Sequence, residues 1–195
     1  MSGTYPTTPE FRSMNFSSEQ ATKTSTTDSG KMFTVQIDGQ RFKFSASYPP
    51  MSRSDFAPVF AFIMKQRSQQ ETFQISLPDL KNANGTISGF VETNGTHSAG
   101  DTSITVDGMT GNLLAGDIIN FNGFDKCYMV VADVTASAGS ATLTIEPPLR
   151  DDLPDNTTVN YDNVQFTVRL TNDVQEFNVG LDNYYRYEVD FIEAL

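Results

Sequence analysis

The sequence predicts a mainly β protein: an antiparallel β-sandwich with one flanking α-helix and an inserted small antiparallel β-barrel. Three observations support this fold class. Apolar and polar residues alternate in several short segments, helical periodicity is convincing only once, and strand-like segments of the same amphipathic character lie near both ends of the chain. At 195 residues the chain has room for one ordinary domain, or for a small domain that carries a second one inserted in it.

The first thirty residues are expected to form an extended N-terminal arm, residues 1–30. They contain thirteen Ser or Thr, only two Phe and no sustained periodicity. An arm of this kind becomes ordered only when something binds it. A frayed terminus and a strand added to a neighbouring sheet are both compatible with this composition.

A sandwich core is predicted for residues 31–81 together with 163–195. Residues 33–37 and 42–46 alternate on either side of Asp38-Gly39, a dipeptide that suits a two-residue turn, so a β-hairpin is expected there. Further alternating segments predict strands, and they occupy residues 73–77, 164–170 and 185–191. Because the early and late strands have the same character, we expect them to share a sheet.

The one convincing helix is predicted over residues 55–67. Its apolar residues recur at helical spacing, and they are Phe56, Val59, Phe60, Ile63 and Met64. Ser54 or Asp55 is expected to cap the helix, and Pro58 is tolerable in its first turn. This apolar stripe is interpreted as a face packed on the sheet rather than as a ligand site.

Residues 82–162 are predicted to fold as an inserted small β-barrel. A structureless connection of that length inside one core would be anomalous. Short strands are expected at 103–106, 118–121, 127–131 and 141–145, with turns that carry Gly or polar residues between them. Several short strands at close spacing without a helical pattern are typical of a small antiparallel barrel.

Charge is spread unevenly and limits the possible partners. The net charge is −11, of which residues 1–81 contribute +2 and residues 82–195 contribute −13. A surface this negative repels a phosphate backbone, so specific recognition of nucleic acid is not expected, although DNA could pass by without sticking. The apolar runs are far shorter than the roughly 20 residues of a membrane-spanning helix. With no secretory leader, a soluble protein made inside a cell is expected.

Catalytic chemistry is poorly supported by the residue types. The single cysteine, Cys127, is expected to be buried and inert, and the single histidine, His97, to lie in an exposed loop. No catalytic, cofactor-binding or metal-binding residue is therefore predicted, and the chain is not expected to be an enzyme.

Three groups of acidic residues are possible exceptions. A calcium site could use the oxygen ligands of Asp151, Asp152, Asp155 and Asn156, but their spacing departs from that of the calcium-binding loop, so a solvated acidic turn is favoured. Acid and base roles could be divided within the pairs Asp173 with Glu176 and Glu188 with Asp190. The second pair is expected on the solvent face of a strand, which argues against catalysis.

Several short motifs resemble a family of tailed-bacteriophage tail proteins. In the predicted sandwich they are DGQRFKF (38–44), YPP (48–50), DFAPVFAFIMKQR (55–67), ETFQISLP (71–78), VQFTV (164–168) and YEVDFIEAL (187–195). In the predicted insertion they are LAGDIINF (114–121), KCYMV (126–130) and TIEPPLR (144–150). The resemblance covers roughly residues 11–195. Phe42 stands where an indole is common in the family, and Ser68 where glycine is common.

The resemblance implies a structural component of the virion tail, of the distal-tail or baseplate type. It implies a homo-oligomeric ring, expected to be six-fold. From the charge distribution we add the hypothesis that part of the acidic half, residues 82–195, lines a channel through which DNA passes without being specifically bound. In the same hypothesis the inserted barrel projects outward and docks neighbouring tail or baseplate proteins. No cofactor and no membrane partner are implied, and the protein would be assembled in the host cytoplasm and located in the virion tail.

Two other classes remain open from the residues. The first is a carbohydrate-binding module that recognises a receptor for the virion, and its aromatic candidates are Phe90, Phe121, Phe124 and Tyr128. The second is an enzyme that acts on cell-surface polymers, for which the sequence offers no constellation of catalytic groups.

Overall fold

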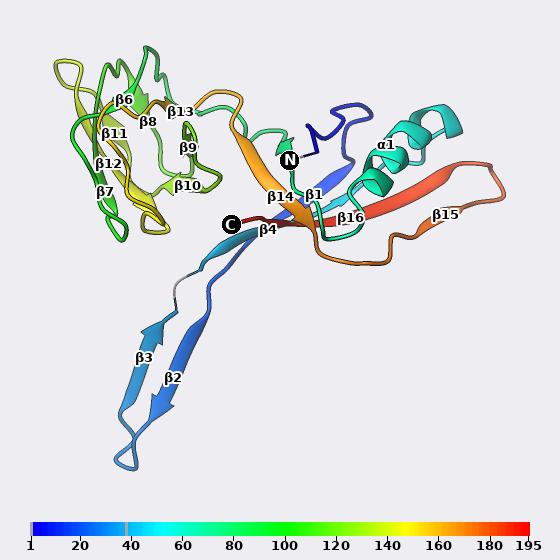
Figure 1. Cartoon of the computed structure of the whole chain (residues 1–195), viewed down its shortest axis with the longest axis horizontal. Helices are drawn as coiled ribbons and strands as arrows, with labels where there is room; N and C mark the ends of the chain where they lie inside the picture. The colour runs from blue at the N-terminus through cyan, green and yellow to red at the C-terminus, as the bar shows by residue number, and fades with distance from the viewer. Residues whose placement is uncertain (1, 38) are drawn as a thin grey trace. The chain divides into compact units, whose positions relative to one another are not determined.

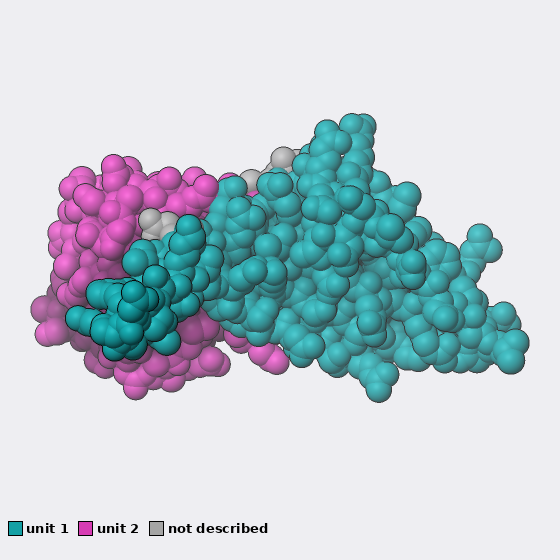
Figure 2. Space-filling model, turned by 90° about the horizontal axis from the view of Figure 1, so that it is seen from below, with its two compact units in different colours: residues 1–73, 168–195 teal, residues 74–167 magenta. Residues whose placement is uncertain are grey.

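The computed structural model describes residues 2–37 and 39–195. It is mainly β, with antiparallel sheets and one helix among the described residues, which confirms the predicted fold class. The chain divides into two compact units, coloured separately in Figure 2. The first unit comprises residues 1–73 and 168–195, and the second comprises residues 74–167.

The main sheet has the strand order β1-β4-β16-β14-β5, and β15 also pairs with β16. These strands are β1 (Ser13–Glu19), β4 (Arg41–Ser47), β5 (Phe73–Ser76), β14 (Gln165–Leu170), β15 (Phe177–Val179) and β16 (Tyr185–Glu193). The early β4 lies beside the late β16, with Phe44 opposite Phe191. The early and late strands therefore do share a sheet, as predicted from their common pattern.

Alternation along β4 and β16 builds the core of the first unit. The buried apolar residues of the two strands are Phe42, Phe44, Ala46, Tyr187, Val189 and Phe191. From the N-terminal segment, Tyr5 is also buried, and its ring lies 5.3 Å from that of Phe191 and 5.8 Å from that of Phe73. Part of the Ser- and Thr-rich segment, residues 13–19, pairs with β4 as the strand β1.

The helix α1 (Arg53–Lys65) buries Phe56, Val59 and Ile63, three residues of the predicted apolar stripe. Its predicted cap was wrong, because Ser52 is the N-cap and its side-chain oxygen accepts the backbone N–H of Asp55 at 3.4 Å. The helix also ends two residues earlier than predicted. Arg67 and Ser68 have positive φ values of 52° and 64°, which no α-helix accommodates.

The strands β2 (Thr22–Thr26) and β3 (Met32–Gln36) form a two-stranded ribbon, which Figure 1 shows extending beyond β1 and β4. The predicted hairpin between residues 33–37 and 42–46 was wrong, because β3 pairs with β2 whereas β4 pairs with β1 and β16. Asp38 of its predicted turn lies outside the described residues. The chain reverses instead at Thr27, whose backbone N–H donates to the Lys31 carbonyl at 2.9 Å.

The second unit contains a small antiparallel barrel with the strand order β13-β9-β10-β12-β7-β6, and it also includes residues 74–76 of β5 and 165–167 of β14. These strands are β6 (Glu92–Thr93), β7 (Ser103–Asp107), β9 (Ile118–Phe121), β10 (Cys127–Val130), β12 (Ala141–Glu146) and β13 (Val159–Asn160), and β8 (Asn112–Leu113) pairs separately with β11 (Val134–Thr135). A bridge between Glu92 and Thr158 joins the two ends of the six-stranded sheet and nearly closes it. The four strands predicted in this segment are confirmed.

The barrel encloses its own hydrophobic core. The core residues come from every strand of the six-stranded sheet except β6, and from the connections between strands, and they include Val91, Ile104, Val106, Met109, Ile119, Phe121, Val130, Leu143, Ile145 and Val159. A continuous core of this kind is what a segment needs to fold as a unit.

Candidate functional site

The β2–β3 ribbon is the most unusual surface of the first unit. All ten residues of β2 and β3 are exposed. Met32, Phe33 and Val35 are 66%, 49% and 64% exposed, and Ile37 directly follows them and is also exposed. A row of large apolar side chains in water is uncommon on a protein that functions alone, and it typically marks an interaction surface.

Strand geometry gathers three of these side chains on one face of the ribbon. Phe33, Val35 and Ile37 alternate along the strand, so they share a face. In the register of the ribbon, Ser25 lies opposite Phe33 and Lys23 lies opposite Val35, and neither covers the apolar side chain across from it. The Lys31 ammonium lies 5.2 Å from the centre of the Phe33 ring and provides a cation–π contact at the tip.

Two-stranded ribbons are marginal in water unless something packs on them. Their outer edges also present unpaired backbone N–H and C=O groups, which favour pairing with another strand. The arrangement of the ribbon is therefore suited to binding a protein surface through apolar contact and edge pairing.

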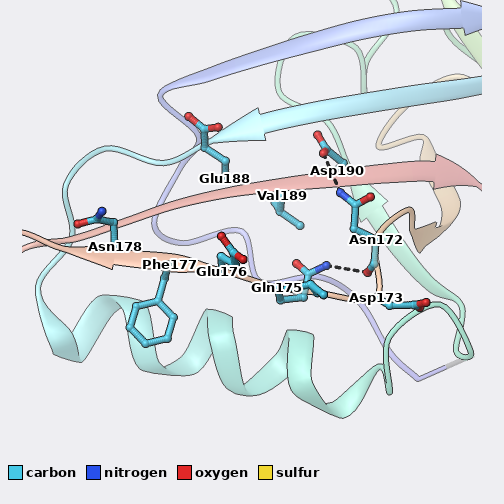
Figure 3. A pocket seen from close by; sticks show the side chains of 10 residues that line it. Asn172, Asp173, Gln175, Glu176, Phe177, Asn178, Glu188, Val189 and Asp190 are labelled. Atoms are coloured by element: carbon cyan, nitrogen blue, oxygen red, sulfur yellow. Dashed lines mark hydrogen bonds between the residues drawn. The ribbon is translucent and has the colours of Figure 1, made fainter.

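A second feature of the first unit is a groove of about 630 Å³, lined by residues 172–178 and 188–190 (Figure 3). Its origin lies in the register of β16. Leu170 of β14 pairs with Phe191, whereas Phe177 of β15 pairs with Tyr187. The six residues 171–176 thus stand opposite only three, 188–190, and they bulge away from β16.

The groove is acidic, and it brings together both of the carboxylate pairs considered from the sequence. Its carboxylates are Asp173, Glu176, Glu188 and Asp190. None of its ten lining residues is Lys or Arg. No carboxylate in the groove therefore has a basic partner among the lining residues, and the surface potential there is negative.

Hydrogen bonds hold two of these carboxylates in place. The side chain of Asp190 accepts from Asn172 at 3.2 Å and from the Ser45 hydroxyl. The carboxylate of Asp173 accepts from the Gln69 amide at 3.0 Å and from the Ser68 hydroxyl. Both aspartates thus connect the bulged segment to neighbouring elements, which is a structural use of the two groups.

The acidic turn weighed as a calcium site is stabilised by hydrogen bonds to the backbone. The Asp152 carboxylate accepts the Ala99 N–H at 2.8 Å, and the Asp155 carboxylate accepts the Gly95 N–H at 2.7 Å. Asp151 and Asn156 are exposed. In residues 2–37 and 39–195, the acidic, histidine and cysteine side chains form no group of three or more that could hold a metal ion.

The structure agrees with the prediction for the single cysteine but not with the prediction for the single histidine. The prediction of an exposed loop for His97 was wrong, since the residue is half-buried, its backbone bridges to Leu153 and its Nε2 lies 3.2 Å from the Thr105 hydroxyl. The prediction that Cys127 is buried is confirmed, and its Sγ donates to the Gln165 carbonyl at 3.5 Å.

Most of the aromatic candidates for sugar stacking belong to the barrel core. Phe121 and Tyr128 are buried, with ring centres 5.6 Å apart. Phe124 is half-buried and packs against the same core. Phe90 is 68% exposed. Two of the four rings are therefore unavailable as flat stacking platforms.

Sequence reasoning did not identify the ribbon or the groove. The alternation of Phe33, Val35 and Ile37 was interpreted as a core strand, although the same pattern describes any strand with one apolar face. The Thr-rich run at residues 22–26 was the available signal, because β-branched threonine favours strands and could have been matched to residues 32–36.

The helix α1, at 13 residues, is too short to cross a membrane, and the described part of the chain has no other helix that could. No protein-family model matches the chain, and no curated protein matches it either.

Proposed function

We propose that this chain is a structural component of a bacteriophage virion tail, and that its copies form a homo-oligomeric ring at the tail tube or baseplate. The observation that carries the proposal is the β2–β3 ribbon, with its exposed apolar face and its open strand edges. The resemblance of the short motifs to tail proteins supplies the biological setting.

A second copy of the chain is a suitable partner for the ribbon. β1 stands at the end of the strand order of the main sheet, beside β4, so it is an edge strand to which another strand could be added. The segment 174–184 adds exposed apolar side chains, and they are Val174, Phe177, Val179, Leu181 and Tyr184. One chain therefore offers both a projecting ribbon and separate surfaces that could receive it.

Such a contact joins two different surfaces, so it is heterologous. Heterologous contacts that repeat with a closing rotation generate rings. In a ring of this kind, each ribbon would be covered by its neighbour and the unpaired backbone groups would be satisfied. Six-fold closure is the expected case.

The acidic groove fits a channel through which DNA moves. Carboxylates with no lysine or arginine among the lining residues repel phosphates, so they would prevent a passing duplex from sticking. In this proposal the groove contributes to the channel wall, and the barrel docks neighbouring tail proteins.

The ring is tested by measuring the mass of the purified protein over a range of concentrations, using light scattering and negative-stain electron microscopy. The wild type is expected to form annuli. The double variant Phe33→Ser/Val35→Ser is expected to be monomeric with unchanged circular dichroism, because both side chains are exposed and contribute little to folding.

The matched control is Thr34→Ser/Gln36→Ser, which alters the opposite face of the same strand. It is expected to form the same annuli as the wild type. A wild-type protein that stays monomeric at every concentration, or a Phe33→Ser/Val35→Ser variant that still forms rings, would contradict the proposal.

A further inference from the structure

The second unit contains a pocket with a lining unlike that of the acidic groove. Its volume is about 330 Å³, and its lining residues all lie between positions 74 and 165. Six of them are carboxamides: Gln74, Asn120, Asn122, Asn160, Asn163 and Gln165. The proposals of a ring and a channel make no use of these amide side chains.

Two of the carboxamides are fixed in position by other groups. The Asn160 amide donates to the Asn120 side-chain oxygen at 2.8 Å. The Asn120 amide in turn donates to the Gln165 carbonyl at 3.2 Å. Both side chains are half-buried, so this part of the pocket is ordered before a ligand arrives, which lowers the entropic cost of binding.

Other polar groups of the pocket are free to bind. Within the described parts of the chain, the side chains of Gln74, Asn122 and Gln165 make no hydrogen bond. The carboxylate of Asp162 likewise accepts no hydrogen bond from any described residue. Each amide offers two donor hydrogens and an acceptor oxygen, and the carboxylate accepts only. This mixture complements hydroxyl groups, which also both donate and accept.

An aromatic ring completes the lining. Phe124 is half-buried beside the polar groups, at the end of the turn that follows β9. Its backbone N–H donates to the Phe121 carbonyl at 3.0 Å, and Gly123 supplies the positive φ of 87° that this turn requires. Apolar ring surface beside planar amides can contact the C–H face of a sugar while the amides bind its hydroxyls.

The charge around the pocket favours a neutral ligand over an anionic one. The lining contains no Lys or Arg, and Asp162 contributes a negative charge. The whole unit, residues 74–167, holds three Lys or Arg against twelve Asp or Glu, a net charge of −9. Phosphates, sulfates and acidic sugars would be repelled, whereas a neutral sugar would not.

We infer that this pocket binds one neutral monosaccharide unit of a surface glycan. The fixed pair Asn120 and Asn160 and the free amide of Asn122 bind the hydroxyl groups, and Phe124 contacts the sugar face. The inference goes beyond assembly of the ring, because it assigns the second unit a ligand of its own.

The experiment uses saturation-transfer NMR on the full-length protein. The probes are the methyl glycosides of glucose, galactose, mannose and N-acetylglucosamine, with glucuronate and sialic acid as anionic comparisons. At least one neutral sugar is expected to bind with a millimolar dissociation constant, on the order of what a small, open site gives. The Asn122→Ala variant is expected to weaken that binding about fivefold or more.

The matched control is Asn94→Ala, an exposed asparagine of the same unit whose side chain makes no hydrogen bond within the described residues and does not line the pocket. It is expected to bind as the wild type does. The inference would be overturned if no neutral sugar gave a saturation-transfer signal, if the anionic sugars bound better, or if Asn122→Ala bound as the wild type does. Ring formation is measured separately and depends on the ribbon, so failure here leaves that proposal standing.

Discussion

At the residue scale, three tyrosines have hydroxyl groups with unusual surroundings. The Tyr48 hydroxyl donates to that of Tyr5 at 2.9 Å, and the Tyr187 hydroxyl donates to the Gln175 side chain at 2.8 Å. All three rings are buried. Burial raises the pKa of Tyr48 to about 12, and it raises the pKa values of Tyr5 and Tyr187 further above the ordinary value for tyrosine.

This burial predicts a loss of stability in alkali. Below pH 10 all three hydroxyls are protonated in the folded and in the unfolded state, so their contribution to the free energy of unfolding is fully present. Between pH 10 and 12 the unfolded chain releases protons that the folded protein retains, and the free energy of unfolding falls by up to about 1.4 kcal/mol per pH unit for each tyrosine. Urea denaturation at pH 8, 10 and 11 measures this slope.

The Tyr48→Phe variant isolates one of these groups. Between pH 10 and 11 the free energy of unfolding of this variant is expected to fall less steeply with pH than that of the wild type, since one titrating hydroxyl is removed. Tyr184→Phe is the matched control, because it removes the hydroxyl of a side chain that is 47% exposed and so shows what the loss of any tyrosine hydroxyl does to the slope. Equal slopes for Tyr48→Phe and the wild type would show that the hydroxyl does not ionise on unfolding in this range.

At the element scale, the start of α1 is determined by one serine among several candidates. Ser52, Ser54 and Asp55 are all residue types that cap helices, and sequence alone gave no reason to choose the earliest. In the structure the Ser52 hydroxyl contacts both Ser54, at 2.7 Å, and the Asp55 carboxylate, at 2.7 Å. The capping group is thus embedded in a small hydrogen-bonded turn.

Replacement of this cap is expected to weaken the helix. Ser52→Ala should lower the free energy of unfolding by about 1 kcal/mol, because the backbone N–H of Asp55 loses its acceptor. Ser54→Ala is the control and should cost only a few tenths of a kcal/mol. Chemical denaturation of the two variants checks the difference, and an equal effect of both would mean that Ser52 is not the dominant cap.

The elements also show why some of the fold could be predicted and some could not. Strands such as β7 and β12 combine alternation with nearby turn residues, so the local pattern was sufficient to predict them. The partner of β3 was predicted wrongly because alternation at Phe33 and Val35 does not reveal which strand pairs with it or whether its apolar face is covered. The groove depends on a register mismatch between β14, β15 and β16, and no local pattern encodes register across strands.

At the scale of the whole molecule, negative charge is concentrated in the second unit. That unit carries −9 of the total −11, so the first unit is close to neutral apart from its acidic groove. Composition predicted the excess of acid in the chain, but not that Asp173, Glu176, Glu188 and Asp190 would line one depression. These four side chains come together only when β15 and β16 pair in the folded chain.

The channel proposal predicts an effect of reversing these charges. In virions that carry Glu176→Lys/Glu188→Lys, genome ejection is expected to slow by about threefold or more, because the new lysines attract DNA phosphates. The purified variant should also bind duplex DNA at low salt and release it as salt is raised. Ejection kinetics and a DNA mobility shift at several salt concentrations measure the two effects.

The comparison for this experiment is Glu146→Lys/Asp151→Lys, which makes the same change in net charge at exposed positions of the barrel. It is expected to eject at the wild-type rate. If both variants eject normally, or if both are slowed equally, the groove has no special relation to the path of the DNA.

Burial of Cys127 in the barrel core has a practical consequence for work on this protein. The chain has no other cysteine, so the native fold shields its one thiol from water-soluble reagents. A cysteine introduced at Thr24 on the ribbon would then react with a maleimide dye ahead of the native thiol. Fluorescence from that position could test in real time whether a neighbouring copy binds the ribbon, as the ring proposal expects, without first replacing the native cysteine.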